Sequence, residues 1–154
     1  MTRVLFVCTG NICRSPTAAG VFTQLAARAG RQSLFVVDSA GTHDYHVGAQ
    51  ADPRSRRHAL QRGCDLSSHR ARQVCAADFE RFDLILAMDR GHQSDLAQLA
   101  PEAHRHKVRL FMDYAPDAGT DEVPDPYYGG DEGFENVLDL VERAGMGLLS
   151  TIQG

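Results

Sequence analysis

The chain has 154 residues, the usual size of one domain, and its 43% hydrophobic and 23% charged residues are an ordinary globular composition. The net charge of −4 does not favour nonspecific binding to nucleic acid, and no apolar run is long enough to cross a membrane. The run Val4–Cys8 is also too short for a signal-peptide core. We therefore expect a single domain over residues 1–154 that works in the cytoplasm with reduced thiols.

Strands and helices are expected to alternate along the chain. Short apolar runs with β-branched residues predict buried strands, and apolar residues spaced by three and four predict amphipathic helices. In chain order we expect a strand over 4–7, a helix over 15–30, a strand over 34–37, a helix over 53–62, a strand over 84–88, a helix over 89–99, a strand over 107–111 and a helix over 131–149.

Three helix starts carry capping signals. Ser15 precedes Pro16, and Asp52 precedes Pro53, so each site offers a side-chain acceptor followed by a proline that loses no needed N–H group. Asp89 stands at the start of the next helix and is expected to cap it.

This alternation favours an α/β fold, a doubly wound four-stranded parallel sheet with helices on both faces. In such sheets, ligands bind beyond the carboxyl ends of the strands, where the strand order reverses. The loop that follows the first strand, Cys8–Pro16, is therefore the expected phosphate-binding site.

The residue types in this loop suit a tetrahedral anion. A helix N-terminus presents free N–H groups, and Gly10 and Asn11 tolerate the left-handed backbone that a tight loop needs. Cys8 would point into these amides, which favour its thiolate, and Arg14 adds a planar fork that matches two phosphate oxygens. The sequence lacks Gly-x4-Gly-Lys-Ser/Thr, so it does not predict a nucleotide triphosphatase.

The charges fall into two blocks. Arg54–Arg72 contains six arginines and one acid, whereas Asp113–Glu135 contains eight acids and neither lysine nor arginine. We expect two solvated faces, with attraction of acidic phosphopeptides as the alternative for the basic block. The acidic block also contains Pro116, Pro124 and Pro126, which predict an ordered, irregular loop.

Residues Val7–Pro16 resemble the signature of the low-molecular-weight protein tyrosine phosphatases. The resemblance continues in the family's order through Asp38–Thr42, His69–Gln73, Ala87–Asp89 and Val123–Tyr128. It covers essentially the whole chain, and the length agrees as well.

The resemblance implies a role for each matched residue. Cys8 attacks phosphotyrosine and becomes a cysteinyl phosphate, while Arg14 and the loop amides hold the phosphoryl oxygens. Asp125 protonates the leaving phenolate and then activates water. The resemblance places the other substrate-binding residues at Thr9, Gly10, Asn11, Ile12, Cys13, Ser15, Tyr45, Tyr127 and Tyr128, and loop-supporting residues at Ser39 and His69. Asn11 and Ser15 also match positions that, with Ser39 and His69, hydrogen-bond around the loop and orient the thiolate.

The resemblance also implies a partner and a chemistry. We expect a phosphotyrosine-containing protein or peptide as substrate, with no cofactor, metal, nucleic acid or membrane, and the resemblance allows a weak homodimer. Cys13 lies in the same loop as Cys8, so we expect it to capture an oxidised Cys8 as a disulfide.

Two other functions stay open. A thioredoxin-coupled arsenate reductase of the same fold uses two further cysteines close together after the third strand, but residues 83–101 contain none. A noncatalytic phosphate-binding or redox-sensing module has no use for a general acid, so Asp125 argues against it.

Overall fold

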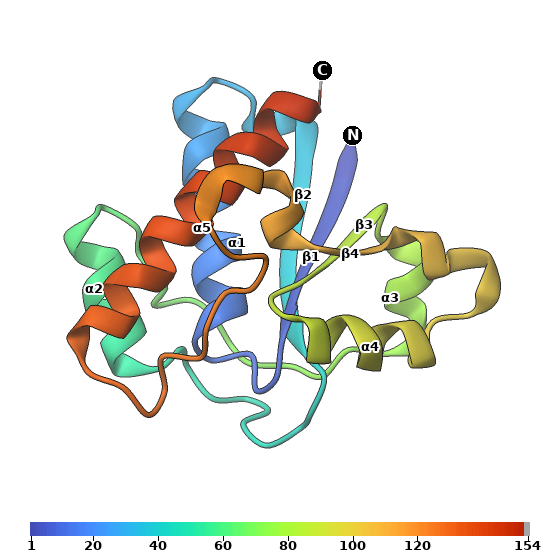
Figure 1. Cartoon of the computed structure of the whole chain (residues 1–154), viewed down its shortest axis with the longest axis horizontal. Coiled ribbons are helices and arrows are strands. Elements are labelled where there is room, and N and C mark those ends of the chain that lie inside the picture. Colours follow the sequence, from blue (N-terminus) through green and yellow to red (C-terminus); the bar gives the residue numbers. More distant parts are fainter. Residues whose placement is uncertain (153–154) are drawn as a thin grey trace.

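The structure, a computed structural model that describes residues 1–152, contains the expected alternation of strands and helices (Figure 1). The strands are β1 (Thr2–Cys8), β2 (Phe35–Gly41), β3 (Leu84–Ala87) and β4 (Val108–Leu110). The α-helices are α1 (Arg14–Arg28), α2 (Pro53–Gln61), α3 (Ala76–Arg81), α4 (Arg90–Leu99) and α5 (Asp131–Thr151). Within residues 1–152, no helix combines the length and the apolar character that a membrane crossing needs.

The four strands form one parallel sheet in the order β2-β1-β3-β4, which confirms the expected fold class. The strand order reverses between β1 and its neighbour β3, and this is where α/β sheets bind ligands. In the register of the sheet, Cys8 is paired with Gly41 and Val7 with Ala87. The ends of β2 and β3 therefore flank the loop that leaves β1.

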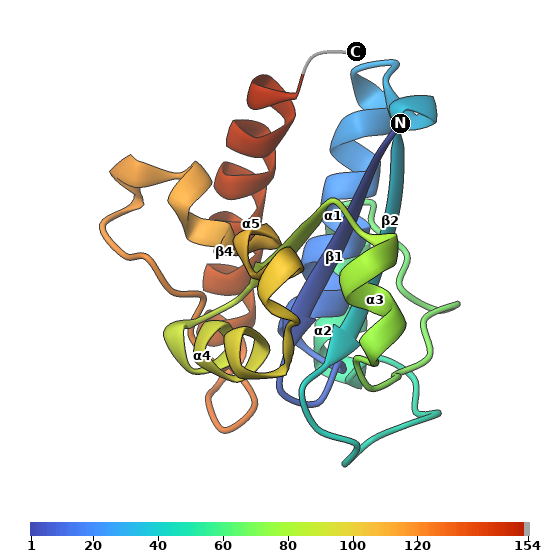
Figure 2. The ribbon, with the colours of Figure 1, turned by 90° about the vertical axis from the view of Figure 1, so that its right-hand side faces the viewer.

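Helices cover both faces of the sheet (Figure 2). The residues of β1 alternate between two hydrophobic cores: Val4 and Phe6 pack on the side of α1 and α5, and Leu5 and Val7 pack on the side of α3 and α4. Because both faces are covered, the strand reads as one continuous apolar run instead of an alternating one.

The first helix differs from the expected one at its start. It begins at Arg14, with Cys13 at the N-cap and no side-chain capping bond, so the expected cap at Ser15 is wrong. Ser15 is fully buried, and its hydroxyl group contacts the side chains of Cys8 and Asn11 instead. The two other expected caps are confirmed, because Asp52 and Asp89 accept backbone N–H groups of their helices.

Other differences concern short elements. Strand β2 continues through Gly41, beyond the expected end at Val37, because its last residues pair with β1. Helix α3 was not expected, since its six residues are too few to show a helical period. Its start is held by the Asp78 carboxylate, which accepts the N–H of Cys75 at 2.8 Å.

The acidic block is the expected ordered, irregular loop. Two short 3₁₀ turns, Phe111–Tyr114 and Pro116–Ala118, precede an irregular stretch that leads into α5. Val123 ties this stretch to the sheet, since its N–H donates to the carbonyl of Met88 at 2.7 Å, just beyond β3.

Candidate active site

The loop between β1 and α1 folds tightly around the end of the sheet. Asn11 has a φ of 59°, the left-handed conformation that was expected. Gly10, which also tolerates this conformation, does not adopt it. A Cβ atom at this position would lie 2.8 Å from Cδ2 of His46, so a larger residue requires the His46 ring to move. The close approach of His46 therefore favours glycine at position 10.

Cys8 lies at the bottom of this loop, with 3% of its surface exposed. Its Sγ atom is 2.9 Å from the Oγ atom of Ser15, which also accepts a hydrogen bond from the Asn11 amide at 2.8 Å. Since Asn11 occupies an acceptor position of the Ser15 oxygen, the serine proton is free to point at the sulfur. This arrangement lets the Ser15 hydroxyl group donate a hydrogen bond to the Cys8 sulfur.

Asn11 organises the back of the loop. Its amide also donates to Ser39 at 3.0 Å, and its side-chain oxygen accepts the N–H of Arg72 at 3.0 Å. The His69 ring contacts the Asn11 carbonyl at 2.7 Å. Burial lowers the pKa of His69, so the ring is neutral and donates from Nε2. Both expected loop-supporting residues, Ser39 and His69, thus contact Asn11 directly.

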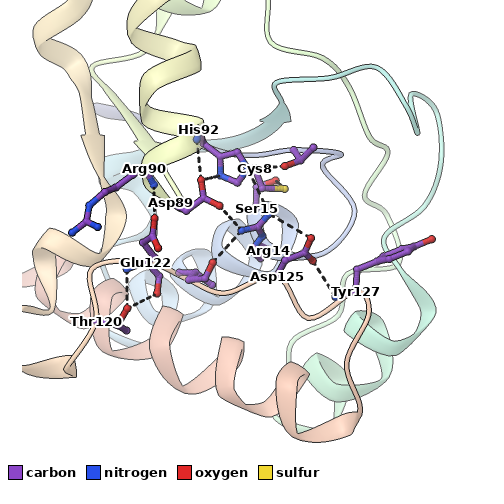
Figure 3. Close-up of polar contacts among 12 residues, drawn as sticks. Cys8, Arg14, Ser15, Asp89, Arg90, His92, Thr120, Glu122, Asp125 and Tyr127 are labelled. Atoms are coloured by element: carbon purple, nitrogen blue, oxygen red, sulfur yellow. Dashed lines mark hydrogen bonds and ion pairs between the residues drawn. The ribbon is translucent and has the colours of Figure 1, made fainter.

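Arg14 is 5% exposed and enters the site from the first turn of α1. Its Nη1 donates to the Asp89 carboxylate at 2.9 Å and to the Val123 carbonyl at 3.1 Å, and its Nη2 lies 3.8 Å from Asp125 (Figure 3). Burial alone would raise the pKa of Asp89, but the His92 backbone N–H and Arg14 together hold it below its usual range. The guanidinium group is therefore oriented before any anion arrives.

Asp125 stands at the mouth of the site, with 47% of its side chain exposed. One of its oxygens accepts the N–H of Tyr127 at 3.0 Å, which fixes the start of the aromatic segment. Arg54 holds the other side of that segment, because it donates to the Tyr127 carbonyl at 2.9 Å and lies 5.4 Å from the Tyr127 ring centre.

These groups surround one pocket of about 160 Å³. Tyr45, on its rim, is 68% exposed and stacks on His43 with 4.9 Å between ring centres. A larger cavity of about 700 Å³ shares Arg14 and Asp125, but Cys8 does not line it. The lining of the smaller pocket consists of Cys8, Thr9, Gly10, Ile12, Cys13, Arg14, Tyr45, Asp125, Tyr127 and Tyr128.

A family model described as low molecular weight phosphotyrosine protein phosphatase matches residues 3–154. The chain belongs to this family. It is 49% identical to the low molecular weight protein-tyrosine-phosphatase of Streptomyces coelicolor, over 98% of this chain and 93% of that protein. It is 37% identical to a low molecular weight phosphotyrosine protein phosphatase of Sus scrofa, over 97% of this chain and 95% of that protein.

Solved structures agree with this assignment. A protein tyrosine phosphatase of Entamoeba histolytica is 40% identical and superposes with a TM-score of 0.95, covering 98% of this chain and 96% of that one. The Drosophila arginine phosphatase DARP is 30% identical with a TM-score of 0.91, covering 100% and 99%. The protein is thus a hydrolase of the low-molecular-weight phosphatase family.

The side chains of Asn11 and Ser15 are fully buried behind the loop and do not line the pocket. They form the expected hydrogen bonds around the loop, and the expected contact of Asn11 with the phosphoryl group falls to its backbone amide. Two further residues were missed, since Asp89 was expected as a helix cap and as part of a matched segment without a role in the site, and His92 was not singled out. Asp89 follows β3, and the carboxyl end of that strand adjoins the loop. The topology therefore contained a signal for Asp89 that a local motif search does not use.

The basic block of this phosphatase is largely neutralised. Arg57 pairs with Asp131 at 3.0 Å, and Arg62 contacts Glu135 at 2.8 Å. Arg62 also contacts two acids further along α5, Asp139 and Glu142. These two arginines therefore join the end of α2 to α5.

Proposed function

We propose that this phosphatase hydrolyses phosphotyrosine in two steps through a cysteinyl phosphate. The Cys8 thiolate attacks phosphorus, the bond to the tyrosine oxygen breaks, and Asp125 donates a proton to the departing phenolate. The Asp125 carboxylate then takes a proton from water as that water attacks the cysteinyl phosphate. Inorganic phosphate leaves, and the Cys8 thiolate and protonated Asp125 are restored.

The observation that carries this proposal is the depth order of three side chains in one pocket. Cys8 lies at the floor with 3% exposure, Arg14 lies beside it, and Asp125 lies at the mouth with 47% of its side chain exposed. In-line displacement needs the nucleophile and the leaving group on opposite sides of phosphorus. A phosphoryl group held by Arg14 and the loop amides would face Cys8 with one side and Asp125 with the other.

The walls of the pocket support an aryl ester as substrate. Tyr45, Tyr127 and Tyr128 line the entrance, and aromatic rings pack favourably against the ring of a phosphotyrosine. Because one structural relative carries the name arginine phosphatase, phosphoarginine is the substrate to compare. We expect kcat/KM for a phosphotyrosine peptide to exceed that for its phosphoarginine counterpart.

Replacement of the nucleophile tests the proposal. Cys8→Ser should lose turnover of p-nitrophenyl phosphate, measured with a chelator present, while it still binds phosphate through Arg14 and the loop amides. The matched control is Cys75→Ser, since Cys75 is exposed and lies outside the pocket. A Cys8→Ser protein that keeps more than a small percentage of the wild-type kcat would contradict the assignment.

We also propose the cytoplasm as the place of action, since the chemistry needs Cys8 as a reduced thiol. A compartment-resolved fractionation checks this.

A phosphotyrosine protein as the partner is tested by trapping with Cys8→Ser. A weak homodimer stays a prediction, and sedimentation over a range of concentrations tests it.

A further inference from the structure

His92 is a buried residue in the first turn of α4, and its ring contacts two residues of the phosphate loop. Its Nε2 atom lies 2.7 Å from the Thr9 hydroxyl oxygen and 3.5 Å from Nη2 of Arg14. Figure 3 shows the ring above Asp89, on the side of Arg14. The two-step chemistry proposed above gives this histidine no role.

The neighbours of the ring indicate which nitrogen carries the proton. Arg14 only donates hydrogen bonds, so Nε2 turns a lone pair toward it. The proton then sits on Nδ1, which is buried and lies 3.1 Å from an Asp89 oxygen but forms no hydrogen bond within residues 1–152. Burial and the nearby Arg14 lower the pKa of His92 to about 4, against the opposite influence of Asp89, Asp95 and Asp125. The ring is therefore neutral at neutral pH.

With the lone pair on Nε2, the Thr9 hydroxyl group is the donor in the 2.7 Å contact. Asp89 supports the same arrangement from below, because one of its oxygens accepts the backbone N–H of His92 and the other accepts Arg14. A protonated ring would repel the guanidinium group at this distance, so the arrangement depends on a neutral histidine.

We propose that Asp89 and His92 form a positioning pair, in which the ring accepts a hydrogen bond from the Thr9 hydroxyl group and holds Thr9 and Arg14 in the geometry that fits a five-coordinate phosphoryl group. The inference rests on the proposed function of Cys8 and Arg14. It predicts that loss of the pair weakens stabilisation of the five-coordinate phosphoryl group more than it weakens binding of tetrahedral phosphate. Only the five-coordinate group needs the loop and the Arg14 guanidinium group aligned with each other.

The experiment compares binding of inorganic vanadate, which adopts the five-coordinate geometry on a thiolate, with binding of inorganic phosphate. By calorimetry, His92→Ala should weaken vanadate binding about tenfold, the usual effect of one lost hydrogen bond, and phosphate binding by less than about threefold. His92→Gln carries an amide oxygen at a similar reach and should restore part of the vanadate affinity. The exposed His106, replaced by alanine, is the matched control.

Thr9→Val tests the other end of the contact, since it removes the hydroxyl group and keeps the shape. It should lower vanadate affinity in the same direction, and the double variant should lose less than the two single losses combined. Equal weakening of both anions, no weakening, or additive losses would overturn the proposal. If His92→Ala does not fold, Thr9→Val and His92→Gln decide. Turnover of p-nitrophenyl phosphate by the wild type tests the proposed function separately, because both anions are measured as ligands.

Discussion

The Sγ atom of Cys8 and the Oγ atom of Ser15 lie 2.9 Å apart in the buried floor of the pocket. The serine has one proton and two acceptors within reach, this sulfur and the Ala40 carbonyl at 3.4 Å. The shorter contact takes the proton when Cys8 is ionised, because a charge-assisted hydrogen bond is the stronger one. Ser15 therefore stabilises the attacking and leaving form of the nucleophile.

Removal of this hydroxyl group should slow the reaction of Cys8. A hydrogen bond to a charged group contributes about 1.5–3 kcal/mol, so Ser15→Ala should reduce kcat/KM by roughly 10- to 100-fold. The rate of Cys8 alkylation by iodoacetamide below neutral pH should fall with it. Ser150→Ala is the control, since Ser150 is an exposed residue of α5 whose hydroxyl group donates to the Gly147 carbonyl, far along the chain from the loop. An unchanged alkylation rate would refute this role.

A lysine should not replace Arg14. The arginine uses one nitrogen for Asp89 and Val123 and turns the other toward the phosphate site, which a single ammonium group cannot do. We expect Arg14→Lys to reduce kcat/KM by about 10²–10³-fold. Arg57→Lys, at an exposed position of α2, should behave like the wild type. Near-normal kinetics of Arg14→Lys would count against the clamp.

The loss in Asp125→Ala should depend on the leaving group. General acid catalysis contributes about 10²–10⁴-fold, and a phenol with a pKa near ~10 needs the proton most. The decrease in kcat/KM should be large for phosphotyrosine and should shrink across a series of aryl phosphates toward p-nitrophenyl phosphate. Asp121 lies in the same loop as Asp125 and pairs with Arg90 of α4, so Asp121→Ala is the control. Equal losses for all esters would mean that Asp125 only shapes the loop.

The phosphate site could be predicted from the sequence, because Cys8, the loop amides and Arg14 lie in one short segment. The partners of these residues are not contiguous. Asp89 reaches Arg14 from beyond β3, and His92 reaches Thr9 from α4, so only the parallel register brings them together.

Ser15 shows why a local rule fails at a functional site. A serine before a proline at a helix start is the usual sign of a cap. The same hydroxyl group serves Cys8 here, and the helix begins one residue earlier without a side-chain cap. Helix α3 was not predicted for a simpler reason, since its six residues are too few to show a helical period.

The two cysteines of the loop should differ in reactivity. Burial, together with the Asp52 carboxylate, raises the pKa of Cys13 to about 12, so this thiol stays protonated at neutral pH. Alkylation at pH 7 followed by peptide mapping should therefore label Cys8 and leave Cys13 unlabelled. After mild peroxide treatment, a Cys8–Cys13 disulfide should form, and faster at higher pH as Cys13 ionises. The idea fails if no disulfide appears and Cys13→Ser does not speed the irreversible loss of activity.

His92 should make the fold less stable in acid. The native ring keeps a pKa of about 4, whereas a histidine in the unfolded chain takes up a proton near ~6.5. Between these values the unfolded chain binds more protons, so the free energy of unfolding decreases as the pH falls, by at most about 3 kcal/mol. Urea unfolding at pH 7.5 and 4.5 should show a smaller decrease for His92→Asn than for the wild type. Equal decreases would mean that the native ring titrates normally.

Both backbone polar groups of Val123 are hydrogen-bonded, because its N–H donates to the Met88 carbonyl and its own carbonyl accepts from Arg14. The chain is thus pinned two residues before Asp125, whereas Tyr128 beyond it is 91% exposed. Asp125 is therefore held in place close to a fixed point beside β3, whereas Tyr128 on the rim of the pocket is not. Substitutions on the rim can therefore change which phosphoprotein is bound without moving Asp125 or changing the reaction.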